Sequence, residues 1–187
     1  MLLQSVLLLA ASMAVNAAKV TFINQDDVPR TLIFTPSVAN GHPYLPDLNV
    51  APYQTVSMDF PWDWEGNWYA ITQGAPRETG MLGEVKFAGF DGITFFDVSG
   101  IVNAEDHHNV KKMYPAHSKE PQSGCDVFWC ANVYWHSEDK QTQATRENHL
   151  ITTLGDRPQD RLDASRSIGN KFSKSARAEQ VEETKQE

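Results

Sequence analysis

The sequence predicts an all-β fold, an antiparallel β-sandwich with loop-rich excursions and a disordered C-terminal tail. Three observations lead to this class. Apolar and polar residues alternate in several short runs, and this two-residue period is that of a half-buried strand. Glycine, proline and asparagine, which favour turns, separate these runs. Before residue 156 the chain has no sustained 3.6-residue periodicity, and many short strands joined by turns are typical of a sandwich.

Alternation and β-propensity give the expected strands in order. They are Lys19–Asn24, Arg30–Phe34, Gln54–Phe60, Trp68–Thr72, Gly83–Phe87, Ile93–Val98, Val127–Tyr134 and Leu150–Leu154. Pro36–Pro52 is rich in proline and is predicted to be a loop. Ala104–Tyr114 is expected to hold a short helix, because Asp106 and Lys112 suit its first and last turns.

The N-terminal segment, residues 1–17, is typical of a secretory signal peptide. Val6–Ala14 is largely apolar, and small residues follow at the cleavage positions. This run is too short to span a bilayer. We therefore expect a secreted, extracellular protein, with association with the cell wall as one option and with no membrane contact after cleavage. An uncleaved N-terminal anchor is the alternative.

The remaining chain is predicted to form one domain, residues 18–155, and a tail, residues 156–187. The net charge of −8 arises within residues 19–155, which hold nine Lys and Arg against 17 Asp and Glu. An acidic surface repels phosphate and anionic lipid, so we expect no nucleic-acid partner. The tail has few large apolar residues and is predicted to be disordered, with a docked helix as the alternative. We expect a monomer.

The chain has two cysteines, Cys125 and Cys130. In a secreted protein such a pair favours a disulfide, which we expect here. A structural zinc site needs four ligands, and no second cysteine pair accompanies this one, so we expect neither a metal nor a cofactor. The neighbouring acidic and histidine side chains are predicted to form a polar loop: Asp106, His107, His108 and His117.

The clearest hairpin turns at residues 89–92 and places Glu84 opposite Asp97, on a face directed to solvent or to a cleft. The other face is predicted to join the core and carries Val85, Phe87, Phe96 and Val98. Directly opposed residues have Cβ atoms about 4.5–5.5 Å apart. Two carboxylates this close need a bound cation, a shared proton or a nearby positive side chain such as Lys86. A solvated pair moderated by Lys86 is the alternative to a functional pair.

The residues around this hairpin resemble the thaumatin-like proteins. Glu84 and Asp97 lie in Glu-Val-Lys-Phe and Phe-Phe-Asp-Val-Ser, which are similar to the family's Ala-Glu-Phe and Phe-Tyr-Asp-Val-Ser. The wider run is more similar to the small secreted thaumatin-like proteins of ascomycete fungi, the CetA-like group. The matching pieces are Gly66–Ala70, Met81–Glu84, Thr94–Ser99, Val110–Pro115, Gly124–Phe128 and Leu150–Gly155.

This resemblance implies a secreted antiparallel β-sandwich with an acidic cleft. In the plant proteins the cleft contains an Arg, a Glu and several Asp, and it is associated with binding, and sometimes hydrolysing, β-1,3-glucan. Glu84 and Asp97 match two of these acids. The next Asp would fall at Val102 or Asn103, which are not acids, and no residue matches the Arg.

Tryptophans offer a second kind of ligand contact, because their rings combine an apolar face with a polar edge. Trp62 and Trp64 alternate with acidic residues and lie on one side if the segment is extended, so they are predicted to stack on a sugar ring. Trp129 and Trp135 form a second candidate pair. The alternative for each is core packing, which we assign to Trp68.

These observations predict a non-catalytic protein that binds a cell-wall glycan, such as β-glucan, or a component of a host surface. The predicted binding residues are Glu84, Asp97, Trp62 and Trp64. One alternative is a weak β-1,3-glucan hydrolase with Glu84 and Asp97 as catalytic candidates, since retaining glycosidases hold two carboxyl groups about 5–5.5 Å apart. Another is a structural or antigenic wall protein without a defined ligand.

Overall fold

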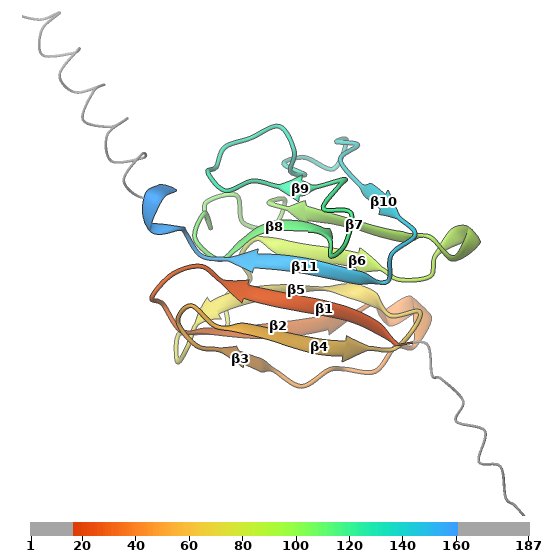
Figure 1. Cartoon of the computed structure of the whole chain (residues 1–187), viewed down its shortest axis with the longest axis horizontal. Helices are drawn as coiled ribbons and strands as arrows, with labels where there is room; N and C mark the ends of the chain where they lie inside the picture. The colour runs from red at the N-terminus through yellow and green to blue at the C-terminus, as the bar shows by residue number, and fades with distance from the viewer. Residues whose placement is uncertain (1–16, 161–187) are drawn as a thin grey trace, which may run out of the picture.

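Two β-sheets packed face to face form the part of the chain that the computed structural model describes, residues 17–160 (Figure 1). Residues 1–16 of the predicted signal peptide and residues 161–187 of the predicted tail lie outside it. Among the described strands, β1 and β11 pair in parallel and the other ladders are antiparallel. The predicted all-β sandwich is confirmed.

The two sheets contain five and six strands. In spatial order the first is β4 (Thr55–Phe60), β1 (Ala18–Asn24), β11 (His149–Leu154), β8 (Val110–Pro115) and β9 (Ser123–Gly124). The second is β10 (Gln143–Thr145), β7 (Thr94–Ser99), β6 (Leu82–Lys86), β5 (Glu65–Thr72), β2 (Arg30–Pro36) and β3 (Leu48–Val50). Two single 3₁₀ turns, η1 (Val38–Asn40) and η2 (Phe90–Gly92), join strands. No described helix is long and apolar enough to cross a membrane.

Three predicted elements are wrong. The helix expected in Ala104–Tyr114 is replaced by a loop and β8, whose alternation the buried Lys111 interrupts. Val127–Tyr134 forms no strand, and only Tyr134 makes an isolated bridge, to Ser99. The loop predicted at Pro36–Pro52 contains the short edge strand β3, which is too brief to show a period.

An aromatic core fills the space between the sheets. Trp68 is fully buried, as predicted, and its ring meets Phe22 edge-on with 5.5 Å between centroids. Phe60 lies 5.9 Å from Trp68 and 5.1 Å from Trp64. The predicted core face of the hairpin is confirmed, because Val85, Phe87, Phe96 and Val98 are all buried.

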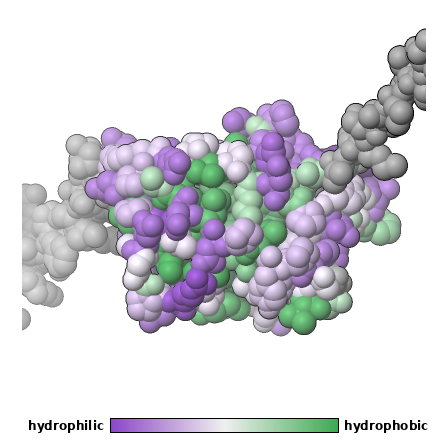
Figure 2. All heavy atoms as spheres, turned by 90° about the horizontal axis from the view of Figure 1, so that it is seen from below, coloured by the Kyte–Doolittle hydropathy of each residue, from purple (hydrophilic) through white to green (hydrophobic). Residues whose placement is uncertain are grey.

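The edge strands β3 and β4 close one side of the sandwich. Figure 2 shows this side, on which hydrophilic residues are interspersed with smaller hydrophobic areas. β3 has only three residues, and the outward side chains of β4 are Thr55, Ser57 and Asp59. Short, polar edge strands discourage pairing with other chains.

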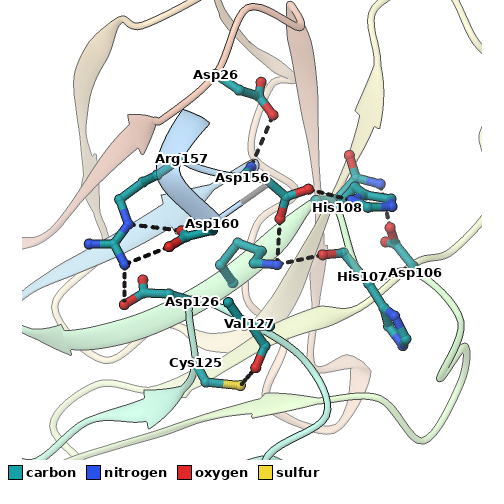
Figure 3. A network of polar contacts seen from close by, with 12 residues as sticks. Asp26, Asp106, His107, His108, Cys125, Asp126, Val127, Asp156, Arg157 and Asp160 are labelled. Carbon is teal, nitrogen blue, oxygen red and sulfur yellow. Dashed lines mark hydrogen bonds and ion pairs between the residues drawn. The ribbon is translucent and has the colours of Figure 1, made fainter. Parts of the chain in front are cut away.

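A buried ion pair joins the turn after β1 to β2. The Arg30 guanidinium donates to Asp26 Oδ2 at 3.0 Å, and both side chains are 2 % exposed. Arg30 also donates to Asn24 Oδ1 at 2.7 Å and to the carbonyl of His108 at 2.8 Å. Asp26 accepts from the backbone N–H of Asp156 at 3.0 Å (Figure 3). The first and last strands are therefore tied together at this end.

The start of the predicted tail belongs to the folded part. Lys111 is buried and donates to Asp156 Oδ1 at 2.7 Å. Arg157 reaches Asp160 at 2.9 Å and Asp126 at 3.1 Å (Figure 3). Residues 156–160, predicted to begin the tail, therefore make contacts with the folded domain.

The predicted disulfide between Cys125 and Cys130 is present. A loop this short loses little chain entropy when it is closed, so the bond contributes about 2 kcal/mol. We expect the double variant Cys125→Ala/Cys130→Ala to lose about that much free energy of unfolding. Urea denaturation with and without a reductant measures the effect. The reductant should destabilise the wild type and leave the variant unchanged, and equal stability of both proteins would contradict this expectation.

Candidate functional site

A row of polar side chains crosses the outer face of the six-stranded sheet. The strand register pairs Thr35 with Asn67, Asn67 with Glu84, and Glu84 with Asp97. Paired residues point to the same face, so these four side chains lie side by side on β2, β5, β6 and β7. Thr142, just before β10, extends the row and donates to Asp97 Oδ2 at 3.4 Å. We call these five residues the polar row.

The polar row lines a cleft of about 400 Å³. Its other lining residues include Ser37, Glu65, Lys86 and Phe95, from the neighbouring positions of the same face. The predicted hairpin register, with Glu84 facing Asp97, is confirmed. The face predicted to meet solvent or a cleft lines this cleft.

Glu84 and Asp97 form a hydrogen-bonded acid pair. Asp97 is 8 % exposed. Burial, the charge of Glu84 and the hydrogen bond to Glu84 together raise the pKa of Asp97 to about 7, although the Thr142 hydroxyl acts in the opposite direction. Burial also raises the pKa of Glu84, and the hydrogen bond with Asp97 lowers it. Asp97 therefore holds the shared proton below about pH 7 and donates it to Glu84.

Lys86 does not neutralise this pair. Its ammonium group donates to Glu65 Oε2 at 2.6 Å, across the register that pairs β5 with β6. The predicted moderation of the two acids by Lys86 is therefore replaced by an ion pair at the rim of the cleft.

Part of the polar row has no partner within the protein. In residues 17–160 the side chains of Thr35 and Asn67 form no hydrogen bond. Their hydroxyl and amide groups are therefore available to a polar ligand in the cleft. Sequence reasoning missed Thr35, Asn67 and Thr142, because their places depend on the pairing of distant strands.

The structure corrects one predicted binding residue. Trp64 is fully buried, and its indole N–H donates to the carbonyl of Pro43 at 3.3 Å. It therefore has no face for a ligand. Trp62 is 42 % exposed at the turn between β4 and β5, but it lines neither this cleft nor the second cavity described below. The stacking role of Trp62 stays a prediction.

The acidic and histidine residues of the predicted polar loop each have separate partners. Asp106 accepts from the backbone N–H of Met81 at 2.9 Å, and His107 Nε2 lies 2.8 Å from the carbonyl of Ala104. His108 contacts Asp156, while His117 pairs with Glu147 elsewhere. No group of three acidic, histidine or cysteine residues able to hold a metal occurs within the described range.

Fold and cleft together define a small all-β protein with a negatively charged cleft on one sheet. No family model matches the chain. It is 50 % identical to the antigenic protein SchS21 of Stachybotrys chartarum over 138 residues, which cover 74 % of this chain and 94 % of that protein. The chain therefore belongs to the family of this fungal protein.

A solved structure shares the fold. The protein elicitor MoHrip2 from Magnaporthe oryzae aligns with a TM-score of 0.57 and 14 % sequence identity. The alignment covers 74 % of this chain and 99 % of that one. At this identity the likeness concerns the sandwich architecture.

Proposed function

We propose that this is a secreted, non-catalytic protein whose cleft binds a neutral glycan, with β-glucan as the first candidate. The observation that carries the proposal is the polar row. Four of its side chains lie on neighbouring strands, and some of its polar groups have no partner within the described part of the protein. Sugar hydroxyls both donate and accept, as do the Asn67 amide and the Thr35 hydroxyl. The ionised Glu84 accepts from a hydroxyl group, and such charge-assisted hydrogen bonds are the stronger ones.

The charge of the cleft and the resemblance to thaumatin-like proteins both support a neutral glycan as the ligand. Lys86 at the rim is paired with Glu65, so the cleft is left with the charge of the acid pair and favours neutral over anionic ligands. The thaumatin-like resemblance supports the same class, because acidic clefts of that family are associated with β-1,3-glucan. The disulfide and the names of the antigenic and elicitor proteins support an extracellular place, where a component of a host surface is the other candidate ligand.

The geometry of the acid pair supports binding over hydrolysis. A retaining glycosidase needs its two carboxyl groups about 5–5.5 Å apart so that the sugar carbon fits between them. Here a hydrogen bond joins the side chains of Glu84 and Asp97 directly. An Asp97 that keeps its proton is a poor nucleophile, so hydrolysis would need Asp97 as the general acid and Glu84 as the nucleophile.

Substitution of the acid pair tests the proposal. We expect Glu84→Gln to weaken binding to soluble β-1,3-glucan about tenfold to a hundredfold, because it replaces the charged acceptor of a sugar hydroxyl by a neutral one. Isothermal titration calorimetry measures the affinity. The matched control is Asp59→Asn, which removes an exposed acid from β4 on the other sheet.

Two outcomes would contradict the proposal. Equal affinity of Glu84→Gln and wild type would place the glycan elsewhere, and no binding by wild type would favour a structural or antigenic wall protein. Reducing-sugar release is measured alongside. Release by wild type that is lost in Glu84→Gln would show a hydrolase instead.

A further inference from the structure

A second cavity, of about 640 Å³, lies beside the disulfide loop. Its walls include Trp129 and Trp135, whose ring centroids are 4.2 Å apart, together with Val133, His136, Asp139 and Gln141. We call it the tryptophan pocket. Trp129 is 56 % exposed, so one large aromatic surface remains open. Cavities of this size that combine apolar walls with a few polar groups are typical of small-ligand sites.

Hydrogen bonds and ring contacts hold the two tryptophans in place. The Trp135 indole donates to the carbonyl of Cys130 at 2.7 Å, and Trp129 meets the ring of His107 edge-on at 4.9 Å. The backbone N–H groups of Trp135 and His136 both donate to Asp139 Oδ2, at 2.7 and 2.9 Å. Aromatic rings that are fixed before binding lose little entropy when a ligand stacks on them.

Polar groups at the edge of the tryptophan pocket indicate the ligand class. Within residues 17–160 the His136 imidazole and the Gln141 amide make no hydrogen bond. Hydrogen bonds from the backbone of His136 and Trp135 lower the pKa of Asp139, so its carboxylate stays charged and able to accept. An indole face beside acceptors and amide donors suits a sugar ring, which has apolar C–H faces and a rim of hydroxyls.

Consecutive residues line the tryptophan pocket and the cleft. Gln141 lines the pocket, and the next residue, Thr142, lines the cleft. The Tyr134 hydroxyl lies 2.9 Å from Thr142 Oγ1, which in turn contacts Asp97. The Tyr134 backbone is also hydrogen-bonded to Val98 of β7 and to Gly100 just after this strand. These bonds hold Tyr134, the neighbour of Trp135, against the end of β7.

From this continuity we infer that the tryptophan pocket is a second subsite for the same glycan. One extended oligosaccharide crosses Thr142, with one part in the cleft and another on the Trp129 face. The inference rests on the proposed function and specifies its ligand as an internal stretch of a glycan chain. A single terminal sugar would fill only one of the two cavities.

The dependence of affinity on chain length tests the inference. Titration calorimetry with β-1,3-linked glucose disaccharide and hexasaccharide should show the hexasaccharide binding wild type at least about tenfold more tightly, because two linked contacts add their free energies. Trp129→Ala should keep the disaccharide affinity and lose this gain. Gln141→Ala should lose part of it. Trp62→Ala tests the rival path over the tryptophan predicted from the sequence to stack on the sugar. The matched control is Tyr44→Ala, which removes an exposed aromatic side chain that lines neither cavity and should keep the gain.

Each of the other outcomes contradicts either the second subsite alone or the proposed function as well. If Trp129→Ala keeps the chain-length gain, or if wild type shows none, the second subsite is absent while the cleft proposal stands. If Trp62→Ala alone loses the gain, the chain runs over Trp62 instead, and the inference is again overturned. If no oligosaccharide binds wild type, the proposed function and the inference both fail. Thermal unfolding of every variant verifies that it is folded.

Discussion

Arg30→Met is expected to lower the free energy of unfolding by about 3–5 kcal/mol. The substitution keeps much of the side-chain volume but leaves the buried carboxylate of Asp26 without its guanidinium partner. Removing one member of a buried ion pair costs this much because the remaining charge stays desolvated. Urea denaturation at pH 7 measures the change.

The control is Arg77→Met, which breaks the exposed ion pair with Asp47 and should cost less than about 1 kcal/mol. The double variant Asp26→Asn/Arg30→Met should recover part of the loss, since it removes the stranded charge. If Arg30→Met costs no more than Arg77→Met, the buried pair contributes nothing to stability.

The dependence of the free energy of unfolding on pH, at acidic pH, gives a second measure of the Asp26–Arg30 ion pair. Burial tends to raise the pKa of Asp26, but the hydrogen bonds from Arg30 and from the backbone outweigh it and lower the pKa to about 2. The contribution of Asp26 is therefore complete above about pH 4 and is lost as the pH falls towards 2. Arg30→Met removes the partner that lowers this pKa, so the acid-dependent loss should be smaller or absent in the variant.

Asp97→Asn is expected to stabilise the protein at pH 8 and to leave its stability almost unchanged at pH 4. Below about pH 4 Asp97 holds its proton in both the folded and the unfolded chain. Between pH 4 and 7 the unfolded chain releases this proton while the folded protein keeps it, so rising pH favours unfolding. The difference between the ordinary pKa of 3.8 and the folded value of about 7 corresponds to roughly 4 kcal/mol at pH 8.

The uncharged amide escapes this cost because it does not ionise and still donates to Glu84. Chemical denaturation of both proteins at pH 4, 6 and 8 measures the difference, and Asp59→Asn is the exposed-acid control. A difference that does not grow with pH would contradict the raised pKa. A substitution that stabilises the fold while weakening glycan binding would show that the acid pair is kept for its ligand.

The hairpin that carries Glu84 and Asp97 could be predicted from the sequence because its information is local. The turn at residues 89–92 sets the register, and alternation sets the face. Thr35 and Thr142 could not be predicted, because they reach the row through strands far apart in the chain. The separation of Thr142 from Asp97 is 45 residues.

The errors at Trp64 and at β8 have a common cause. The alternation of apolar and polar residues does not show where a turn or a buried charge interrupts it. A turn closed by the Trp64 N–H and the Pro61 carbonyl, 3.1 Å apart, interrupts the run before β5 and directs Trp64 into the core. Lys111 looks like a surface residue, yet its ammonium group is buried between Asp156 and the His107 carbonyl. A polar residue at a buried position breaks the alternation, so the sequence pattern did not predict β8.

The parallel pairing of β1 with β11 has a consequence for how the protein is made. Lys19 pairs with His149, so β1 cannot pair with β11 until nearly the whole domain has been synthesised. Contacts between residues this far apart in sequence slow folding, because the intervening chain must be closed into a large loop. A chain still emerging from the ribosome cannot complete the five-stranded sheet. The five-stranded sheet, and with it the sandwich, is completed only after β11 has left the ribosome.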